Sequence, residues 1–257
     1  MEEISVIVTT YDRKEFLTET LNSILKQTFN NFELIVVDNY SNYDFFTYIN
    51  SFNDKRIRPF QNKNNGIIAV NRNFGIKKAK GKYLAFCDDD DIWMEKKLEV
   101  QIDRIRQNGC DLVSSNMILF KNDIKNIVGK QKNRLVNNFN DLLKTNQINT
   151  STVLVKRSEL VYFSCDKVLL TIEDYALWLN LYSNGFKFDF INEPMIYYRI
   201  SESMSQKDWV TKHLRTMYLL ISIKLEFTNS KVFKPFFIHF LKYISKKIFI
   251  RVNARNN

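Results

Sequence analysis

Short runs of apolar residues alternate with stretches of helical periodicity along the first 116 residues of the chain. A short aliphatic run bounded by polar residues is typical of a buried strand, whereas apolar residues three and four positions apart line one face of a helix. The pattern predicts strands at residues 4–8, 32–37, 57–60, 83–87 and 112–115, and helices around 17–25, at 67–79 and around 98–105. Strands that alternate with helices in this way indicate an α/β fold, in which helices flank a mostly parallel central sheet.

The second half of the chain is less regular. Residues 121–150 are polar and rich in Asn and Lys, which predicts a loop-heavy crossing with a short helix near 141–144. Further on, the pattern predicts a strand at 152–155, an aromatic-rich helix at 175–182, strands at 188–191 and 196–199, and helix from residue 209 onward. We therefore expect one domain over residues 1–205, with halves at 1–116 and 117–205, followed by a helical C-terminal extension at 206–257.

Two local signals refine these elements. Asp12, with Glu15 three residues later, matches a capping box and is expected to cap the first helix. Pro59 removes a backbone donor, so the strand at 57–60 is expected at an edge of the sheet.

Acidic side chains follow three of the predicted strands where each strand ends. Asp12 lies just past the first strand, Asp38 ends the second, and four consecutive aspartates at residues 88–91 follow the strand at 83–87. Ligands of parallel sheets bind beyond the carboxyl ends of the strands. We therefore expect these side chains to converge on one edge of the sheet.

The four aspartates at residues 88–91 have two interpretations. A solvated acidic loop is the simpler one, but here the run is anchored by an apolar strand before it and by Ile92 and Trp93 after it. Adjacent carboxylates repel one another, and a divalent cation relieves that repulsion. Mg²⁺ and Mn²⁺ prefer carboxylate oxygens and keep positions for phosphate oxygens, so the run favours a metal–phosphate site.

Histidine and cysteine usage narrows the chemistry. The 257 residues include only His213 and His239, so a histidine-rich zinc site or a histidine relay is poorly supported. Acid–base and metal chemistry would then rest on carboxylates. The three cysteines form no CxxC pair, the N-terminus resembles a strand more than a secretion signal, and no uncharged apolar stretch reaches the roughly 20 residues of a membrane span. We therefore expect a cytoplasmic protein with reduced thiols.

The formal net charge of +10 is concentrated at the C-terminal end. Residues 231–257 hold seven Lys or Arg and no Asp or Glu, which leaves +3 for the preceding 230 residues. After Pro235, basic residues are interleaved with aromatic and aliphatic ones, a pattern typical of an amphipathic basic helix. Such a helix either lies on an anionic membrane surface or packs on protein, which is the domain itself or a second subunit of a homodimer. No nucleic-acid partner is expected, because no RNA- or DNA-binding motif accompanies the charge.

Nine segments, in order along the chain, resemble the family 2 glycosyltransferases, enzymes of the GT-A fold that use a nucleotide-diphosphate sugar. They are SVIVTTYDR at 5–13, LNSILKQTF at 21–29, FELIVVD at 32–38, NG at 65–66, NRNFGI at 71–76, GKYLAFCDDDDIW at 81–93, EDYALW at 173–178, YR at 198–199 and SMS at 203–205. Ser201 stands where many members of the family have a histidine. The resemblance implies that residues 1–116 bind the nucleotide sugar and that residues 117–205 bind the acceptor.

The resemblance also implies a role for each matching residue. The residues expected at the nucleotide are Thr10 and Tyr11 at the base, Asp38 at the base or ribose, Arg72 at the nucleotide or its diphosphate, and Asp88 with Asp89. The two acids of the DxD motif, Asp90 and Asp88, would hold Mn²⁺ or Mg²⁺, and Asp174 would be the general base. Trp93, Glu173 and Arg199 are expected in the acceptor site or the loop that closes it.

The reaction implied is a metal-dependent, inverting transfer by a hexosyl- or N-acetylhexosaminyltransferase, because inversion needs a single base on the acceptor side. The donor, expected to be a UDP-sugar by family habit, would pass its sugar to a glycan or lipid-linked acceptor in surface polysaccharide synthesis, such as lipopolysaccharide or capsule. The enzyme would then lie at the cytoplasmic face of the inner membrane. Two alternatives stay open: a nucleotidyltransferase on a similar sheet, and a catalytically degenerate module that binds a nucleotide sugar or a membrane.

Overall fold

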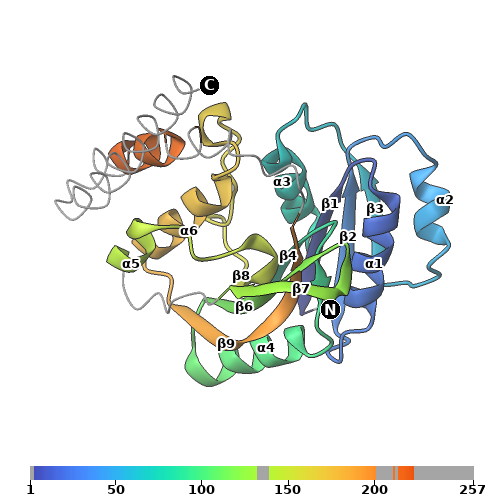
Figure 1. Cartoon of the computed structure of the whole chain (residues 1–257), viewed down its shortest axis with the longest axis horizontal. Helices are drawn as coiled ribbons and strands as arrows, with labels where there is room; N and C mark the ends of the chain where they lie inside the picture. Colours follow the sequence, from blue (N-terminus) through green and yellow to red (C-terminus); the bar gives the residue numbers. More distant parts are fainter. Residues whose placement is uncertain (1–2, 132–138, 201–210, 212–213, 223–257) are drawn as a thin grey trace, which may run out of the picture.

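The chain folds around one mixed sheet, in which the first four strands are mutually parallel. The structure is a computed structural model that describes residues 3–131, 139–200, 211 and 214–222. The strands are β1 (Ile4–Thr10), β2 (Phe32–Asp38), β3 (Ile57–Gln61), β4 (Tyr83–Asp88), β5 (Ile92–Trp93), β6 (Leu112–Lys121), β7 (Asp123–Gln131), β8 (Leu154–Lys156) and β9 (Phe188–Arg199). Their order is β3–β2–β1–β4–β8–β6–β9–β5, with β7 paired to β6 (Figure 1).

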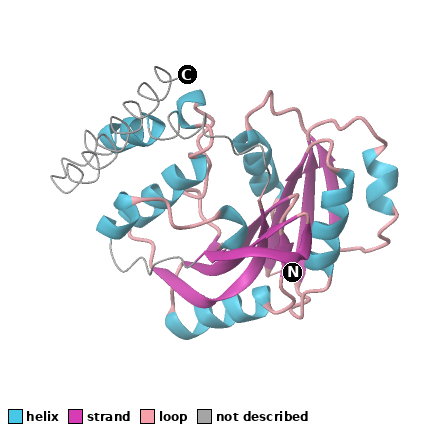
Figure 2. Cartoon of the chain, in the orientation of Figure 1, coloured by secondary structure: helices cyan, strands magenta, loops and turns pink. Residues whose placement is uncertain are grey.

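Helices cover both faces of the sheet (Figure 2). They are α1 (Lys14–Leu25), α2 (Phe45–Asn50), α3 (Ile68–Lys78), α4 (Lys97–Asn108), α5 (Phe139–Lys144) and α6 (Glu173–Ser183), with single 3₁₀ turns at η1 (Thr150–Thr152) and η2 (Lys167–Leu169). Residues 214–222 are also helical. The predicted α/β class, with helices flanking a central sheet, is confirmed.

Two hydrophobic cores lie on opposite faces of the sheet, and β1 contributes to both. Val6 and Val8 pack with apolar residues of α1, α2 and α4, whereas Ile7 packs with residues of α3, α5 and α6. Successive side chains of a strand point to opposite faces, which explains the split. Every residue of β1 and of β2 is buried, as expected for central strands covered on both sides.

The second half of the sheet departs from the predicted pattern. β8 runs antiparallel to β4 and β6, whereas β9 runs parallel to β6. The predicted strands at 188–191 and 196–199 are one strand, β9, which continues through Pro194 because its pairing with β6 shifts register near Asn116. The loop-heavy interpretation of 121–150 was also wrong in part, since 123–131 form β7, an edge strand whose first residues are exposed.

The two local signals had different outcomes. β3 lies at the edge of the sheet, as Pro59 predicted. The capping box at Asp12 is wrong: Asp12 has a φ of 53°, its Oδ1 accepts a hydrogen bond from the backbone N–H of Asn42, and Arg13 is the residue that precedes α1.

The C-terminal predictions lie largely outside the described residues. These include the segment at 203–205, Ser201, both histidines and the basic residues of 231–257. Within the described part of the chain, no helix is both long enough and apolar enough to span a bilayer.

Candidate active site

The four aspartates of residues 88–91, here called the acidic turn, lie where β4 ends and the chain turns toward β5. The parallel register sets Thr9 of β1 opposite Asp88, and Thr10 opposite Asp38 of β2. The carboxyl ends of three neighbouring strands therefore meet at one edge of the sheet, where ligands of α/β folds bind.

Asp89 and Asp90 are held from the side of β1 and α1. Thr10 Oγ1 donates to Asp89 Oδ2 at 2.8 Å, and Arg13 Nη1 lies 3.2 Å from Asp89 Oδ1 and 2.9 Å from Asp90 Oδ2. Burial raises the pKa of Asp89 to about 6, and burial followed by the charge of Asp88 raises the pKa of Asp90. Sequence reasoning did not select Arg13, although a cation directly after the first strand and its loop was the available signal.

Asp91 is the last residue of the acidic turn, and Arg199 contacts the turn there. Asp91 is fully buried, its Oδ1 accepts from the backbone N–H of Arg199 at 3.2 Å, and burial raises its pKa well above the ordinary value. Arg199 Nε donates to the carbonyl oxygen of Asp90 at 3.0 Å, and its guanidinium lies 4.5 Å from the ring centroids of both Phe16 and Phe120. The structure thus places Arg199 as a support of the acidic turn.

Asp88 is contacted from α3, on the opposite side of the turn. Arg72 Nη2 lies 2.7 Å from Asp88 Oδ1, while Arg72 Nη1 lies 2.9 Å from Glu173 Oε1. Arg72 and Glu173 are buried, and the side chain of Asp88 is 31% exposed. Three residues that the sequence analysis selected separately are therefore joined in one chain of ion pairs.

Asp174 is the second residue of α6 and directly follows Glu173. Its Oδ1 accepts from the backbone N–H of Tyr175 at 2.6 Å, and its Oδ2 accepts from Asn146 Nδ2 at 3.1 Å and from Thr150 Oγ1 at 3.4 Å. These hydrogen bonds fix the orientation of the carboxylate. Sequence reasoning missed Asn146 and Thr150, because nothing local marked them within a polar stretch.

A pocket of about 510 Å³ lies beyond the ends of β1, β2 and β3. It is lined by residues that follow these three strands: Tyr11, Asn39, Tyr40, Lys63 and Asn65. Tyr11 is 54% exposed and Tyr40 is 58% exposed, so both rings are available for stacking. Exposed aromatic faces stack on nucleobases, and a lysine nearby suits a phosphate.

Asp38 supports the loop that lines this pocket. Its carboxylate is fully buried and accepts from the backbone N–H of Ser41 at 3.0 Å and from Gln61 Nε2 at 2.9 Å. These bonds tie the loop after β2 to the end of β3. The structure therefore places Asp38 under the loop that carries Asn39 and Tyr40, with its oxygens bound to protein.

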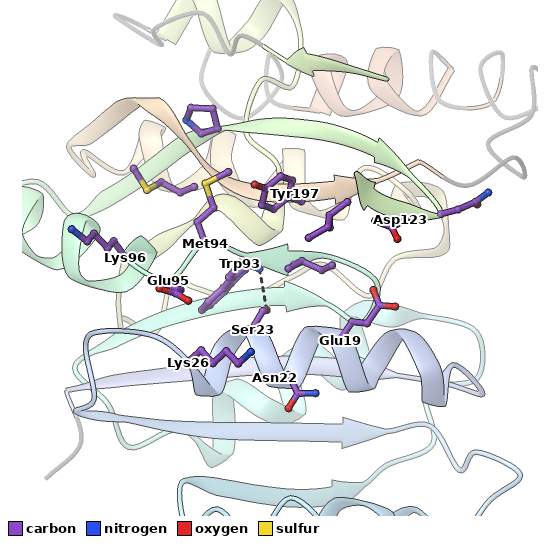
Figure 3. Close-up of a pocket in the computed structure, with 15 residues that line it drawn as sticks. Glu19, Asn22, Ser23, Lys26, Trp93, Met94, Glu95, Lys96, Asp123 and Tyr197 are labelled. Atoms are coloured by element: carbon purple, nitrogen blue, oxygen red, sulfur yellow. Dashed lines mark hydrogen bonds between the residues drawn. The ribbon is translucent and has the colours of Figure 1, made fainter. Parts of the chain in front are cut away.

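Trp93 lies in a second cavity, a groove of about 840 Å³ between α1 and the segment around β5 and β9 (Figure 3). The Trp93 side chain is buried, and its backbone N–H donates to Ser23 Oγ at 3.0 Å. Glu19, at one end of this groove, pairs with Arg199. The groove thus adjoins the residue that supports the acidic turn.

The donor set of the acidic turn fits a hydrated divalent cation better than a closed protein cage. Among the residues that the structure describes, no group of three or more His, Cys, Asp or Glu side chains could enclose a metal ion. Asp88 and Asp90 each contact an arginine through one oxygen, and a carboxylate has a second oxygen to offer. Mg²⁺ characteristically binds one or two carboxylates together with phosphates.

Comparison with known sequences gives an independent result. The model of the family named "Glycosyl transferase family 2" matches residues 5–162. In Escherichia coli, the UDP-Glc:alpha-D-GlcNAc-diphosphoundecaprenol beta-1,3-glucosyltransferase WfaP is 32% identical over 226 residues, 88% of each chain. The putative teichuronic acid biosynthesis glycosyltransferase TuaG of Bacillus subtilis is 28% identical over 214 residues, which cover 80% of this chain and 82% of TuaG.

Comparison with solved structures confirms the predicted GT-A fold. S. aureus TarS 1-349 superposes with a TM-score of 0.68 at 22% sequence identity, over 86% of this chain and 65% of that one. The same protein in complex with UDP-GlcNAc superposes with a TM-score of 0.68, over 85% of this chain and 66% of that one. At this identity the likeness concerns the fold alone.

Proposed function

Because the chain belongs to glycosyl transferase family 2, we propose that it moves a sugar from a UDP-sugar donor to a lipid-linked acceptor in surface polysaccharide synthesis. One observation carries the proposal: the aromatic pocket, the acidic turn and Asp174 are linked along one edge of the sheet. β1 leads into the pocket at Tyr11, Thr10 contacts Asp89, and Arg72 joins Asp88 to the residue before Asp174.

The pocket supports a nucleotide donor. Tyr11 and Tyr40 offer two exposed rings for the base, and Lys63 offers a cation on the same wall. The name of the E. coli relative specifies UDP-Glc, and TarS has been crystallised with UDP and with UDP-GlcNAc. We therefore propose a UDP-sugar, with UDP-glucose as the first donor to test.

We propose that Asp88 and Asp90 hold Mn²⁺ or Mg²⁺ against the donor diphosphate. A divalent cation bound there would neutralise the charge that develops on the diphosphate as the sugar–phosphate bond breaks. The chain's own residues orient the two carboxylates: Arg72 contacts Asp88, Arg13 contacts Asp90, and Arg199 binds the carbonyl oxygen of Asp90.

We propose that Asp174 accepts the proton of the acceptor hydroxyl. Its Oδ2 is oriented by Asn146 and Thr150, and a carboxylate held in this way can act as a general base in an in-line displacement. One base on the acceptor side is what inversion at the anomeric carbon requires. Inversion agrees with the name of the E. coli relative, which specifies a UDP-Glc donor and a beta-1,3 product, because the glucose of UDP-Glc is alpha-linked to its diphosphate.

The acceptor side of the proposal includes a membrane surface. Both E. coli relatives, WfaP and WfgD, are named for an undecaprenol-diphosphate acceptor. An acceptor of this kind is anchored in a bilayer, and the seven basic residues of 231–257 suit an anionic lipid surface. We propose peripheral binding at the cytoplasmic face of the membrane.

The test is a transfer assay on the full chain with a panel of nucleotide sugars and a GlcNAc-diphospholipid, with Mn²⁺, with Mg²⁺ or with EDTA. We expect metal-dependent transfer with release of a nucleoside diphosphate. Asp90→Ala and Asp174→Asn should each lower the rate by at least about 100-fold, the contribution typical of a positioned acid or base. Asp103→Asn is the matched control, because the Asp103 side chain is 54% exposed on α4.

Four results would contradict parts of the proposal. Undiminished transfer in EDTA would remove the cation, and undiminished transfer by the Asp174 variant would remove that residue as the base. Release of a sugar 1-phosphate with a nucleotidylated product would instead favour a nucleotidyltransferase. Nucleotide-sugar binding without any turnover would favour a degenerate binding module.

A further inference from the structure

Arg72 is a buried arginine whose two terminal nitrogens contact carboxylates from the two halves of the domain. Nη2 lies 2.7 Å from Asp88 Oδ1 at the end of β4, and Nη1 lies 2.9 Å from Glu173 Oε1 at the start of α6. Arg72 itself is only 5% exposed. The charges of Asp88, Glu173 and Asp174, in that order, raise the Arg72 pKa against the opposing effect of burial.

The surroundings of Arg72 fix its position. Three residues further along α3, a Cβ on Gly75 would lie 2.5 Å from Ile7 Cγ2, so the helix lies as close to β1 as a glycine allows. Asn73 Nδ2 donates to the carbonyl oxygen of Phe163 at 2.7 Å, and the N–H of Phe163 donates back to Asn73 Oδ1 at 2.9 Å. The ring of Phe163 then lies 5.2 Å from the Arg72 guanidinium. The arginine is thus held by the helix beneath it and by an anchored ring.

Glu173 depends on this contact. Its Oε1 accepts from Arg72, and its Oε2 is buried without a hydrogen-bond partner among the described residues. A buried carboxylate that loses its one cation either moves toward water or takes up a proton. Because Asp174 is the next residue, any movement of Glu173 would also move the first turn of α6.

We propose that Arg72 is a positioning residue that sets the separation between the donor-side carboxylate Asp88 and the acceptor-side turn of Glu173 and Asp174. This inference rests on the proposed function, since it concerns the same reaction. The planar fork of a guanidinium can hold two carboxylates at a fixed spacing, whereas an ammonium is a single point charge. The role differs from direct binding of the donor diphosphate, because both terminal nitrogens are already bound to protein carboxylates.

The two roles predict opposite kinetic signatures. If Arg72 positions the base turn, Arg72→Met lowers kcat for transfer by about 100-fold or more, while the dissociation constant for the UDP-sugar, measured by calorimetry without added metal, changes less than about threefold. If Arg72 binds the diphosphate, donor affinity falls instead. Arg72→Lys should recover part of kcat, because it keeps a cation near both carboxylates but cannot hold both in one plane.

The partner and control variants make the test specific. Glu173→Gln should reproduce the loss of kcat, and the double variant with Arg72→Met should be no slower than Arg72→Met alone, since both changes break the same contact. Arg58→Met is the matched control: Arg58 pairs with the buried carboxylate of Glu33 near the start of β2, away from the acidic turn. It should lower the unfolding midpoint but leave kcat within about twofold.

A readout without substrate separates this inference from the proposed function. Urea unfolding of the wild type, Arg72→Met, Glu173→Gln and the double variant should give a non-additive cycle, because the contact exists before any ligand binds. If the wild type transfers no sugar, the proposed function fails. An additive cycle would by itself overturn the contact between Arg72 and Glu173 as an energetic link. If the wild type is active, a wild-type kcat in Arg72→Met, or a loss confined to donor affinity, overturns the positioning role. Should Arg72→Met fail to fold, Arg72→Lys and Glu173→Gln carry the same test.

Discussion

Lys97, the first residue of α4, is a fully buried cation that the proposed reaction does not use. Its Nζ donates to Gln101 Oε1 at 2.7 Å and lies 3.9 Å from the centroid of the Trp93 ring. No ion pair to Lys97 is present among the described residues. Burial lowers the pKa of Lys97 from 10.5 to about 7. Replacement by Met keeps most of the side-chain volume and removes the titration, so Lys97→Met isolates the effect of this charge.

The sign and size of the effect follow from the two pKa values of Lys97. Between about 7 in the folded protein and 10.5 in the unfolded chain, the unfolded chain holds one more proton. The free energy of unfolding must then rise with pH in this window, by about 1.4 kcal/mol per pH unit. From pH 7.5 to 9.5 the expected gain is about 3 kcal/mol. Below pH 7 both states are protonated, and the slope from this residue disappears.

The assay compares urea unfolding of the wild type and of Lys97→Met at pH 6.0, below the window in which linkage acts, and at pH 7.5, 8.5 and 9.5, within about that window. Subtracting the two curves removes the tyrosines and cysteines that titrate in both proteins. Lys97→Met should have its largest advantage at pH 6.0, and the advantage should shrink by about 3 kcal/mol between pH 7.5 and 9.5. The lost hydrogen bond to Gln101 costs about 1–3 kcal/mol at every pH, so it shifts the difference without changing its slope.

Lys96→Met is the matched control, because Lys96 is the exposed neighbour of Lys97 and should show no such slope. A difference between wild type and Lys97→Met that stays constant from pH 7.5 to 9.5 would refute the reasoning. It would mean that the face of the Trp93 ring compensates for the water that Lys97 gives up on folding.

Two further outcomes are expected. A Cβ on Gly81 would lie 2.6 Å from the backbone nitrogen of Ser5, so Gly81→Ala should lower the free energy of unfolding by about 1–3 kcal/mol in urea titrations. Gly129→Ala is the control and should change this free energy little, because its Cβ would meet a side-chain methyl of Leu119 at 3.8 Å. Arg199→Met removes the hydrogen bond to the Asp90 carbonyl oxygen. It should reduce metal affinity or transfer by about 10- to 100-fold, measured by metal titration and by the transfer assay. A loss confined to the unfolding midpoint would contradict a role in holding the acidic turn.

The first half of the fold was predictable because each element has, within its own sequence, the apolar residues that it buries. β1 and β2 are mainly aliphatic, and central parallel strands covered on both faces need such apolar runs. β7 was not predictable in this way, since its stability comes from pairing with β6 and its own residues are exposed and polar over most of their length. Asp12 shows the same limit on a smaller scale. Its sequence fits a helix cap, but the loop after β2 offers the backbone N–H of Asn42 as a competing donor.

The carboxylates of the candidate site were predictable, and their partners were not. Asp88, Asp90 and Asp174 stand in short motifs, so a resemblance along the chain was enough to find them. Asn146 and Thr150 have no motif, because they matter only through where the chain between β7 and α6 brings them. A short sequence motif can identify a catalytic carboxylate, but it does not identify the residues, distant along the chain, that orient that carboxylate.

Three arginines from three separate elements balance the acidic turn, and they differ in how firmly they are held. Arg72 of α3 and Arg199 of β9 are 5% and 6% exposed, whereas the side chain of Arg13, beside α1, is 49% exposed. The two buried arginines contact Asp88, the carbonyl oxygen of Asp90 and distant acids at once, so they fix the shape of the turn. Among the described residues, Arg13 contacts the turn's own carboxylates, Asp89 and Asp90, through one nitrogen. A half-exposed contact of this kind is weak, so we expect Arg13 to be the arginine that the proposed cation and diphosphate would displace with the least effect on the fold. Two buried arginines and one half-exposed arginine together explain how a turn of four aspartates can be rigid and still be accessible to a ligand.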